Sequence, residues 1–127
     1  MTENQIATII VACAFQIHVK LGPGLLESVY EAVLCYELTK QGLRVERQVL
    51  IPVMWDGAII GDGFRADLIV ENKIIIELKS VEKSNPLHNK QLLTYLRLTN
   101  KHLGLLINFG RGRIKDGIER VVNGLIE

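Results

Sequence analysis

The sequence predicts one domain of the α/β class, in its α+β form, with a mixed central sheet flanked by helices and spanning residues 1–127. Three observations predict this class. Helical spacing of apolar residues over 3–20 and 25–41 indicates two helices. Runs of branched apolar residues within 44–79, separated by turn-forming residues, indicate three strands joined by hairpins. A third helical segment then leads to an apolar run at 103–109, so the order is an N-terminal helix followed by α-β-β-β-α-β.

Composition limits the class of protein. The chain is 48% hydrophobic and 23% charged, which is typical of a soluble globular protein. The apolar stretch 6–17 is too short for a bilayer and has no basic leader, so we expect no membrane attachment and no signal peptide. Cys13 and Cys35 lack metal-site spacing, which indicates reduced thiols of a cytoplasmic protein without an iron–sulfur cluster. A net charge of +1 neither indicates nor excludes nucleic-acid binding.

The first helix is expected from Glu3 to about Lys20. Thr2 and Gln5 fit a capping box at its start, and the segment Gly22-Pro23-Gly24 ends it.

The second helix is expected from about Leu25 to Gln41, with a wide apolar face. On a helical wheel Glu27 and Glu31 both fall beside Leu38, which belongs to that face. The sequence therefore predicts that at least one of the two glutamates points toward the core, and it leaves open which one.

Three strands are expected at about 44–55, 58–70 and 74–79. Pro52 indicates an edge strand or a bulge in the first, and the second is interrupted at Gly61-Asp62-Gly63. Asp56-Gly57 is a hairpin turn signal between the first two strands.

The turn at Glu71-Asn72-Lys73 decides how the second and third strands face each other. With three residues in the turn, Val70 pairs with Ile74, Asp67 lies opposite Glu77, and Arg65 lies opposite Lys79, all on one face. With two residues, the carboxylates of Asp67 and Glu77 would point to opposite faces. We expect the three-residue turn.

The last third of the chain is predicted to begin with a helix that Asn85 caps and that runs to about Asn100. The strand at 103–109 follows this helical crossover, which favours a parallel pairing with the strand at 74–79. After Gly110 two readings stay open, a helical turn at 115–120 and a last strand at 118–122.

Asp67, Glu77 and Lys79 are the residues with the clearest chemical implication. Charges in apolar strands are costly to bury unless they are paired or bind a metal. Mg²⁺ prefers hard oxygen ligands, and Asp67, Glu77 and the backbone carbonyl of Leu78 could provide three. Lys79 could then stabilise charge that develops on a phosphate, as metal-assisted phosphodiester hydrolysis requires. A structural ion-pair network with Arg65 and Lys79 is the alternative.

The segment Asp67…Glu77-Leu78-Lys79 resembles the signature of the PD-(D/E)XK nucleases, with Ala66 in place of the proline. The run Gly24-Leu25-Leu26-Glu27-Ser28-Val29-Tyr30 is similar to the motif of the GxxExxY proteins within that superfamily. The resemblance continues through the segments 63–67, 91–96 and 105–110. It implies a restriction-endonuclease-like fold and a Mg²⁺- or Mn²⁺-dependent nuclease.

The resemblance also implies roles for individual residues. Glu27 matches the acid on the first core helix, reaching the metal directly or through water. Asp67 and Glu77 match the metal ligands, and Lys79 matches the catalytic lysine. Gln91 with Tyr95 resembles the Gln-x-x-x-Tyr motif of RecB-like nucleases, in which the pair contacts the site or the DNA. The implied partner is nucleic acid, with DNA expected, and a domain this small is consistent with a homodimer.

The other candidate residues each have a purely structural interpretation as well. Tyr30 and Tyr95 are expected to be core aromatics whose hydroxyls find partners. His88 lies one helical turn before Gln91 and is expected either near the site or as a packing residue. The short basic loop at 111–115 could grip phosphates or be solvated; its charged residues are Arg111, Arg113 and Lys115. For the whole chain, the alternative to an enzyme is a non-catalytic module that binds nucleic acid or protein and retains the nuclease fold.

Overall fold

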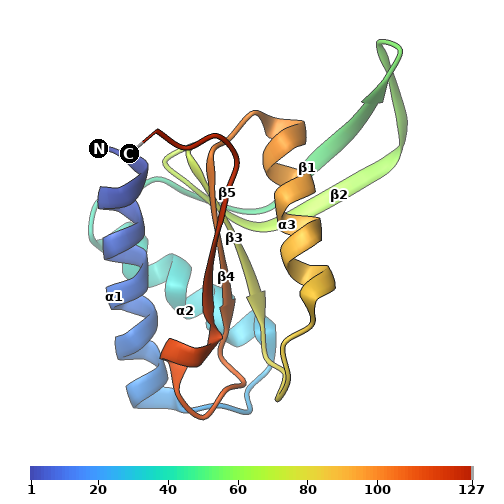
Figure 1. Ribbon diagram of the computed structural model, residues 1–127. Helices are drawn as coiled ribbons and strands as arrows, with labels where there is room; N and C mark the ends of the chain where they lie inside the picture. Colours follow the sequence, from blue (N-terminus) through green and yellow to red (C-terminus); the bar gives the residue numbers. More distant parts are fainter. Residues whose placement is uncertain (127) are drawn as a thin grey trace.

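Five strands form one sheet in the order β1-β2-β3-β4-β5 in the computed structural model, which describes residues 1–126 (Figure 1). The strands β3 and β4 are parallel, and every other neighbouring pair is antiparallel. The elements in chain order are α1 (Glu3–Leu21), α2 (Glu27–Lys40), β1 (Val45–Trp55), β2 (Ala58–Val70), β3 (Ile74–Lys79), α3 (Pro86–Thr99), β4 (Leu103–Asn108), the 3₁₀ helix η1 (Ile114–Gly117) and β5 (Ile118–Val122).

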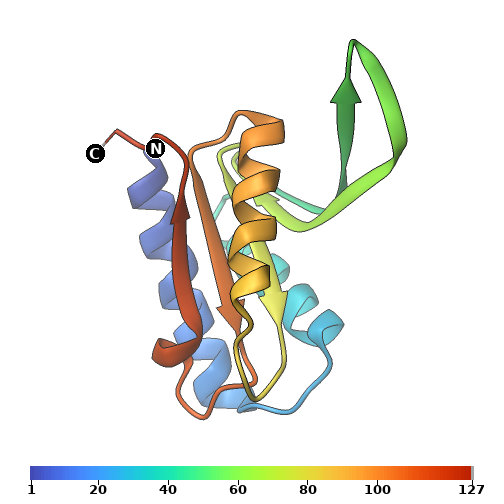
Figure 2. The ribbon, with the colours of Figure 1, turned by 45° about the vertical axis from the view of Figure 1, so that its right-hand side comes forward.

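Helices cover both faces of the sheet and enclose two separate cores. The helices α1 and α2 pack on one face, and α3 packs on the other (Figures 1 and 2). Side chains of β3 alternate between the cores: Ile74 and Ile76 contact the α1–α2 side, and Ile75 contacts the α3 side. Because β3 is buried on both faces, its run of apolar residues is unbroken until Glu77.

Most of the predicted element boundaries are confirmed. Thr2 and Gln5 form the capping box of α1, and Asn85 caps α3 by accepting a hydrogen bond from the backbone of Leu87. The strands β2 and β3 have the predicted bounds, but β2 is continuous through residues 61–63, where an interruption was predicted. The second helix begins at Glu27, two residues later than predicted, and β4 ends at Asn108. The tail contains both of the elements considered for it, a helical turn (η1) followed by a strand (β5).

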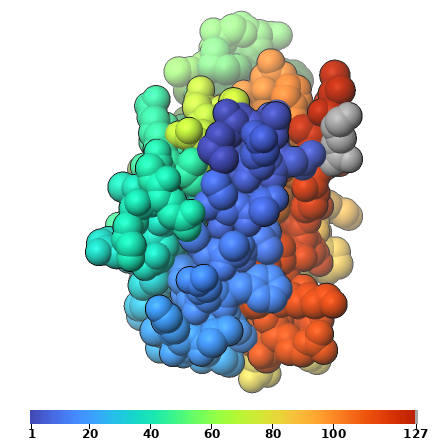
Figure 3. All heavy atoms as spheres, turned by 90° about the vertical axis from the view of Figure 1, so that its left-hand side faces the viewer, coloured from blue at the N-terminus to red at the C-terminus, as the bar shows by residue number. Residues whose placement is uncertain are grey.

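Helix α1 is long and apolar enough, with a mean hydropathy of 1.3, to meet the length and composition of a membrane span. The expectation that this segment is too short for a bilayer was therefore wrong as to length and composition, and the absence of membrane attachment stays a prediction. One side of the helix is buried in the α1–α2 core, as in a core helix; its buried residues are Ile6, Ala7, Ile10, Cys13, Ala14, Ile17 and His18. Figure 3 shows the helix between α2 on one side and the η1–β5 segment on the other.

A bulge divides the β1–β2 ribbon. The register shifts between Ile51 and Val53, so Pro52 alone faces the three residues 61–63. At Gly63, with φ +75°, an added Cβ would lie 2.3 Å from the carbonyl oxygen of Ile51, so only glycine fits there. The bulge predicted at Pro52 is thus confirmed, and beyond it the ribbon projects from the domain (Figure 2).

The contact between β4 and α3 predicts a steric effect at Gly104. An added Cβ there would lie 2.9 Å from the side chain of Leu92, so we expect Gly104→Ala to lower the free energy of unfolding by about 1–3 kcal/mol. Gly112→Ala is the matched control, because nothing lies within 4 Å of its added Cβ. Urea unfolding of the two variants checks the prediction, and equal stabilities would contradict it.

Candidate functional site

The strands β2 and β3 separate at the two strand acids. Their last paired residues are Leu68 and Ile76, and the register there is that of the predicted three-residue turn. Beyond this pair, side chains replace the backbone ladder. The amide of Leu78 donates to Asp67 Oδ2 at 2.8 Å, and the amide of Asp67 lies 3.4 Å from Glu77 Oε1. The predicted approach of Asp67 to Glu77 is therefore confirmed.

Glu77 is held in an environment that disfavours its charge. Its side chain is buried, with 8% of its surface exposed. Burial first, and then the negative charge of Asp67 and a hydrogen bond with its side chain, raise the pKa of Glu77 to about 9, although Lys79 opposes this. Near neutral pH Glu77 is therefore protonated, and the two carboxyl groups together carry about one negative charge.

The buried acid of α2 is Glu31, with 7% of its surface exposed, whereas Glu27 is exposed. Arg47 donates to Glu31 at 3.0 Å, and Gln48 Nε2 donates to Glu31 at 2.6 Å and to Asp67 at 3.2 Å. The prediction that at least one of the two glutamates points toward the core is confirmed, and that residue is Glu31. The wheel placed both acids beside Leu38, but Glu27 is the first residue of the helix and nothing covers it.

A hollow of about 290 Å³ lies between α2 and the point where β2 and β3 separate. Its lining residues are Glu27, Ser28, Glu31, Gln48, Asp67 and Leu78. Three acidic side chains thus surround a space large enough for a phosphate group. Among residues 1–126, Glu27 makes no side-chain hydrogen bond or ion pair, so its carboxylate is free to take a ligand.

Helix α3 approaches the acids from the other face of the sheet. Burial, followed by the charges of Glu77 and Asp67, raises the pKa of Tyr95. Burial and then Lys79 lower the pKa of His88, and Glu27 opposes this shift, so His88 lies within electrostatic range of the site. Gln91 lies between the two along the helix and is exposed, with no side-chain hydrogen bond among the described residues. Its role in the site stays a prediction.

The segment that follows β3 is fixed by the end of β4. The amide of Phe109 donates to the carbonyl of Lys79 at 2.8 Å. The buried side chain of Asn108 accepts from the amides of Val81 and Gly110 and donates to the carbonyl of Val81, all within 3.1 Å. At Gly110 an added Cβ would lie 2.4 Å from the backbone of Val81. Asn108 and Gly110 therefore hold the backbone just after Lys79.

Tyr30 joins the same framework to the loop before α2. Its ring stacks on Phe109 with centroids 4.3 Å apart, and its hydroxyl donates to Gly22 and accepts from Leu25. The Ser80 hydroxyl donates to the carbonyl of Leu25 at 2.6 Å. Tyr30 is fully buried, so it is a core aromatic with a satisfied hydroxyl, and it orders the loop that leads to Glu27.

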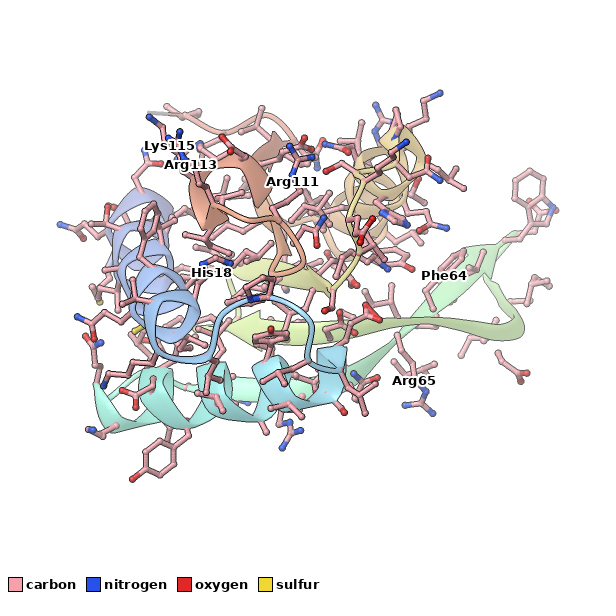
Figure 4. The ribbon with its side chains drawn as sticks, turned by 90° about the horizontal axis from the view of Figure 1, so that it is seen from below. His18, Phe64, Arg65, Arg111, Arg113 and Lys115 are labelled. Atoms are coloured by element: carbon pink, nitrogen blue, oxygen red, sulfur yellow. The ribbon has the colours of Figure 1, made fainter. Side chains whose placement is uncertain are left out.

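The prediction that Arg65 lies opposite Lys79 was wrong. Arg65 lies opposite Leu50 of β1 rather than Lys79, because β2 has already left β3 at that position. Its guanidinium donates to the carbonyl of Gln48 at 3.3 Å. Figure 4 shows Arg65 pointing outward on the side opposite to Phe64, whose ring contacts Tyr95 with centroids 5.2 Å apart.

The basic loop gathers its side chains beyond the end of β4 (Figure 4). His18 Nε2 lies 2.9 Å from the carbonyl oxygen of Arg111, which ties the loop to α1. Arg113 is exposed and pairs loosely with Asp116 at 3.9 Å, and Lys115 is also exposed. The loop is thus anchored through its backbone and presents its cations to solvent.

A family model described as the PD-(D/E)XK nuclease superfamily matches residues 4–121. The chain belongs to this superfamily. Comparisons with curated proteins and with solved structures give no match. The PD-(D/E)XK assignment confirms the predicted fold class and the resemblance at the level of the superfamily. The finer likeness to the GxxExxY proteins stays a prediction.

The donor groups of this PD-(D/E)XK site fit a divalent cation. Within residues 1–126, no three His, Cys, Asp or Glu side chains are gathered so as to hold a metal alone. Asp67 and Glu77 nevertheless supply two carboxyl groups in contact, and the carbonyl of Leu78 is adjacent. Mg²⁺ needs only one or two carboxylates, since it keeps several waters. A cation here would also offset the burial and the repulsion from Asp67 that together keep Glu77 protonated.

Sequence reasoning missed Gln48 and Asn108. Gln48 has φ +51° in the middle of β1, which turns its side chain toward Glu31 and Asp67. The available signal for Asn108 was a polar residue at the end of the apolar run of β4. Both residues position groups of the site through hydrogen bonds.

The raised pKa of Glu77 predicts how stability depends on pH. Between the ordinary value of 4.5 and about 9, the folded protein keeps a proton that the unfolded chain loses, so stability falls as pH rises through this range. Glu77→Gln keeps the shape without the acid. In EDTA at about pH 8 we expect it to melt about 3 °C or more above the wild type, and to match it near pH 5.

Mn²⁺ provides the second half of that test. The ion should raise the melting temperature of the wild type at about pH 8 and leave Glu77→Gln unchanged. Glu37→Gln on α2 is the control and should respond as the wild type does. Equal responses of all three proteins to Mn²⁺ would contradict a site at Glu77.

Asn108 predicts a second measurable effect. Asn108→Ala leaves the amides of Val81 and Gly110 without their partner, so we expect a loss of about 2–4 kcal/mol in the free energy of unfolding. Asn123→Ala removes a single side-chain hydrogen bond, to Lys101, and should cost about 1 kcal/mol. Urea unfolding measures both, and a smaller loss for Asn108→Ala than for its control would refute the account.

Proposed function

We propose that this PD-(D/E)XK protein is a Mg²⁺- or Mn²⁺-dependent deoxyribonuclease that hydrolyses phosphodiester bonds. The observation that carries the proposal is the contact of Asp67 with Glu77 where β2 and β3 separate, with Lys79 two residues further along β3. A buried acid held against a half-buried one is costly unless a cation joins them. Superfamily membership supports the nuclease class, and the chemistry of these donors supports the metal.

Asp67, Glu77 and the carbonyl of Leu78 would hold the ion. When bound, a divalent cation stabilises charge on a phosphate and lowers the pKa of a water molecule. The phosphate would occupy the hollow beside Asp67. This hollow has a volume of about 290 Å³, which leaves room for a phosphate and a water, and the carboxylate of Glu27 lines it. Glu31 is engaged by Arg47 and Gln48, so its part is to hold Gln48 against Asp67.

In the hydrolysis, a water oxygen forms a bond to phosphorus, the bond to one ester oxygen breaks, and that oxygen takes up a proton. Glu27 lines the hollow, has no side-chain partner among residues 1–126, and would orient the attacking water. Lys79, which acts electrostatically on both Glu77 and His88, would stabilise the negative charge that develops on the phosphoryl oxygens. Gln91 and Tyr95, from α3, would complete the pocket on the far side.

The distribution of charge supports a nucleic-acid substrate. Helix α3 has basic residues at Lys90 and Arg97 and no acid, and Arg65 is exposed beside the site. The acids gathered at the site offset these cations, which accounts for a net charge of only +1. Arg111 and Arg113 would extend the contact along the phosphate backbone.

Hydrolysis of labelled single-stranded DNA, duplex DNA and RNA, with Mg²⁺, Mn²⁺ or EDTA, tests the proposal. We expect metal-dependent cleavage of DNA that Glu77→Ala abolishes and that Lys79→Met lowers by roughly 10²–10³-fold. Glu37→Gln is the control acid and should retain full activity.

The same assay distinguishes the alternatives. Equal background from the wild type and Glu77→Ala, together with retained binding of DNA, would indicate a non-catalytic binding module. Preferential cleavage of RNA would support nuclease activity but contradict the proposal that DNA is the substrate.

A further inference from the structure

The β1–β2 ribbon beyond the bulge forms an arm, residues 50–64, that projects from the domain (Figures 1 and 2). Six large apolar side chains of the arm are between 38% and 69% exposed: Leu50, Met54, Trp55, Ile59, Ile60 and Phe64. They point to both faces of the ribbon, since Met54 pairs with Ile59 on one face and Val53 pairs with Ile60 on the other.

Such an arm is poorly stabilised by its own contacts. A two-stranded hairpin is at best marginally stable in water, because it has no third element to cover its faces. Only the base of the arm is covered: Ile51 is buried in the α3-side core, and Phe64 contacts Tyr95. From Pro52 to Asp62 the ribbon belongs to neither of the two core clusters. An apolar surface of this size is typical of an interaction site.

Charge argues against nucleic acid as the partner of the arm. Asp56 and Asp62 are the only charged residues among 50–64, and both are acidic. Phosphate groups of DNA or RNA would be repelled, and so would an anionic lipid surface. The partner is therefore expected to offer an apolar surface of its own.

We propose that the arm packs against the arm of a second copy of this chain in a two-fold symmetric dimer. In such an interface each arm both provides and receives the same apolar surface. Roughly 100 Å² is exposed on each of the six side chains, and one face of each arm presents about half of them, so a face-to-face contact of two arms would bury about 600 Å² in total, which is the size of a weak, reversible association. No part of this inference depends on nuclease activity.

The arms pack through their faces rather than edge to edge. Both strands of the arm are edges, because β3 pairs only with Leu68–Val70 of β2, and on the β1 edge Pro52 has no amide hydrogen. The register shift at the same position also interrupts the regular edge. The side chains on the faces, with Trp55 near the tip, are therefore the contact surface.

Sedimentation equilibrium of the full chain between about 1 and 100 µM tests the dimer. An interface of this size is expected to have a dissociation constant of tens of micromolar. The double variant Trp55→Ser, Ile60→Ser should weaken association by about tenfold or more while its circular dichroism keeps the wild-type helix and sheet content. Val19→Ser is the control, since Val19 is 82% exposed on α1, away from the arm.

Trp55 is the only tryptophan, so its fluorescence reports on the arm directly. Its emission should shift to shorter wavelength as protein concentration rises, in the wild type and in Val19→Ser alike. A wild type that stays monomeric at about 100 µM, or a dimer that the double variant leaves intact, would overturn the proposal. A shift that requires added DNA or phosphatidylcholine vesicles, at constant protein concentration, would also overturn it and assign the arm to that partner.

Discussion

The architecture of the site depends on the contact of Asp67 with Glu77. These residues lie where the ladder between β2 and β3 ends, and their side chains take over the hydrogen bonds that the strands no longer make. The consequence is electrostatic, since burial first, and then the negative charge of Asp67, raise the pKa of Glu77 so that it keeps its proton. A fold built only for stability would place apolar residues here. The pair is understandable as a site that a cation completes.

The rest of the molecule holds this contact between two rigid supports. On one side, Tyr30 stacks on Phe109 and orders the loop that ends at Glu27. On the other side, Asn108 fixes the backbone that follows Lys79. The segments that resemble the GxxExxY proteins therefore have a structural explanation. Their glycines, asparagine and aromatic residues position the loops around the acids, which are the residues that we propose carry the chemistry.

Local patterns were sufficient to predict most of the fold. Alternation and turn residues gave the strands, and a three-residue turn at Glu71 correctly placed Asp67 beside Glu77. The wheel could not choose between Glu27 and Glu31, because that choice depends on which turn of α2 is covered by Arg47 and Gln48 of β1. The separation of β2 from β3, which moved Arg65 away from Lys79, depends on the twist of the whole sheet. The projecting arm was likewise beyond local patterns, since burial depends on tertiary contacts.

The most direct test of the account is a crystal structure of the protein grown with Mn²⁺, with anomalous diffraction used to locate the ion. The account predicts an anomalous peak between the carboxylates of Asp67 and Glu77, next to the carbonyl of Leu78, with Glu77 ionised. The absence of a peak there, with the two carboxyl groups still hydrogen-bonded to each other in saturating Mn²⁺, would contradict it.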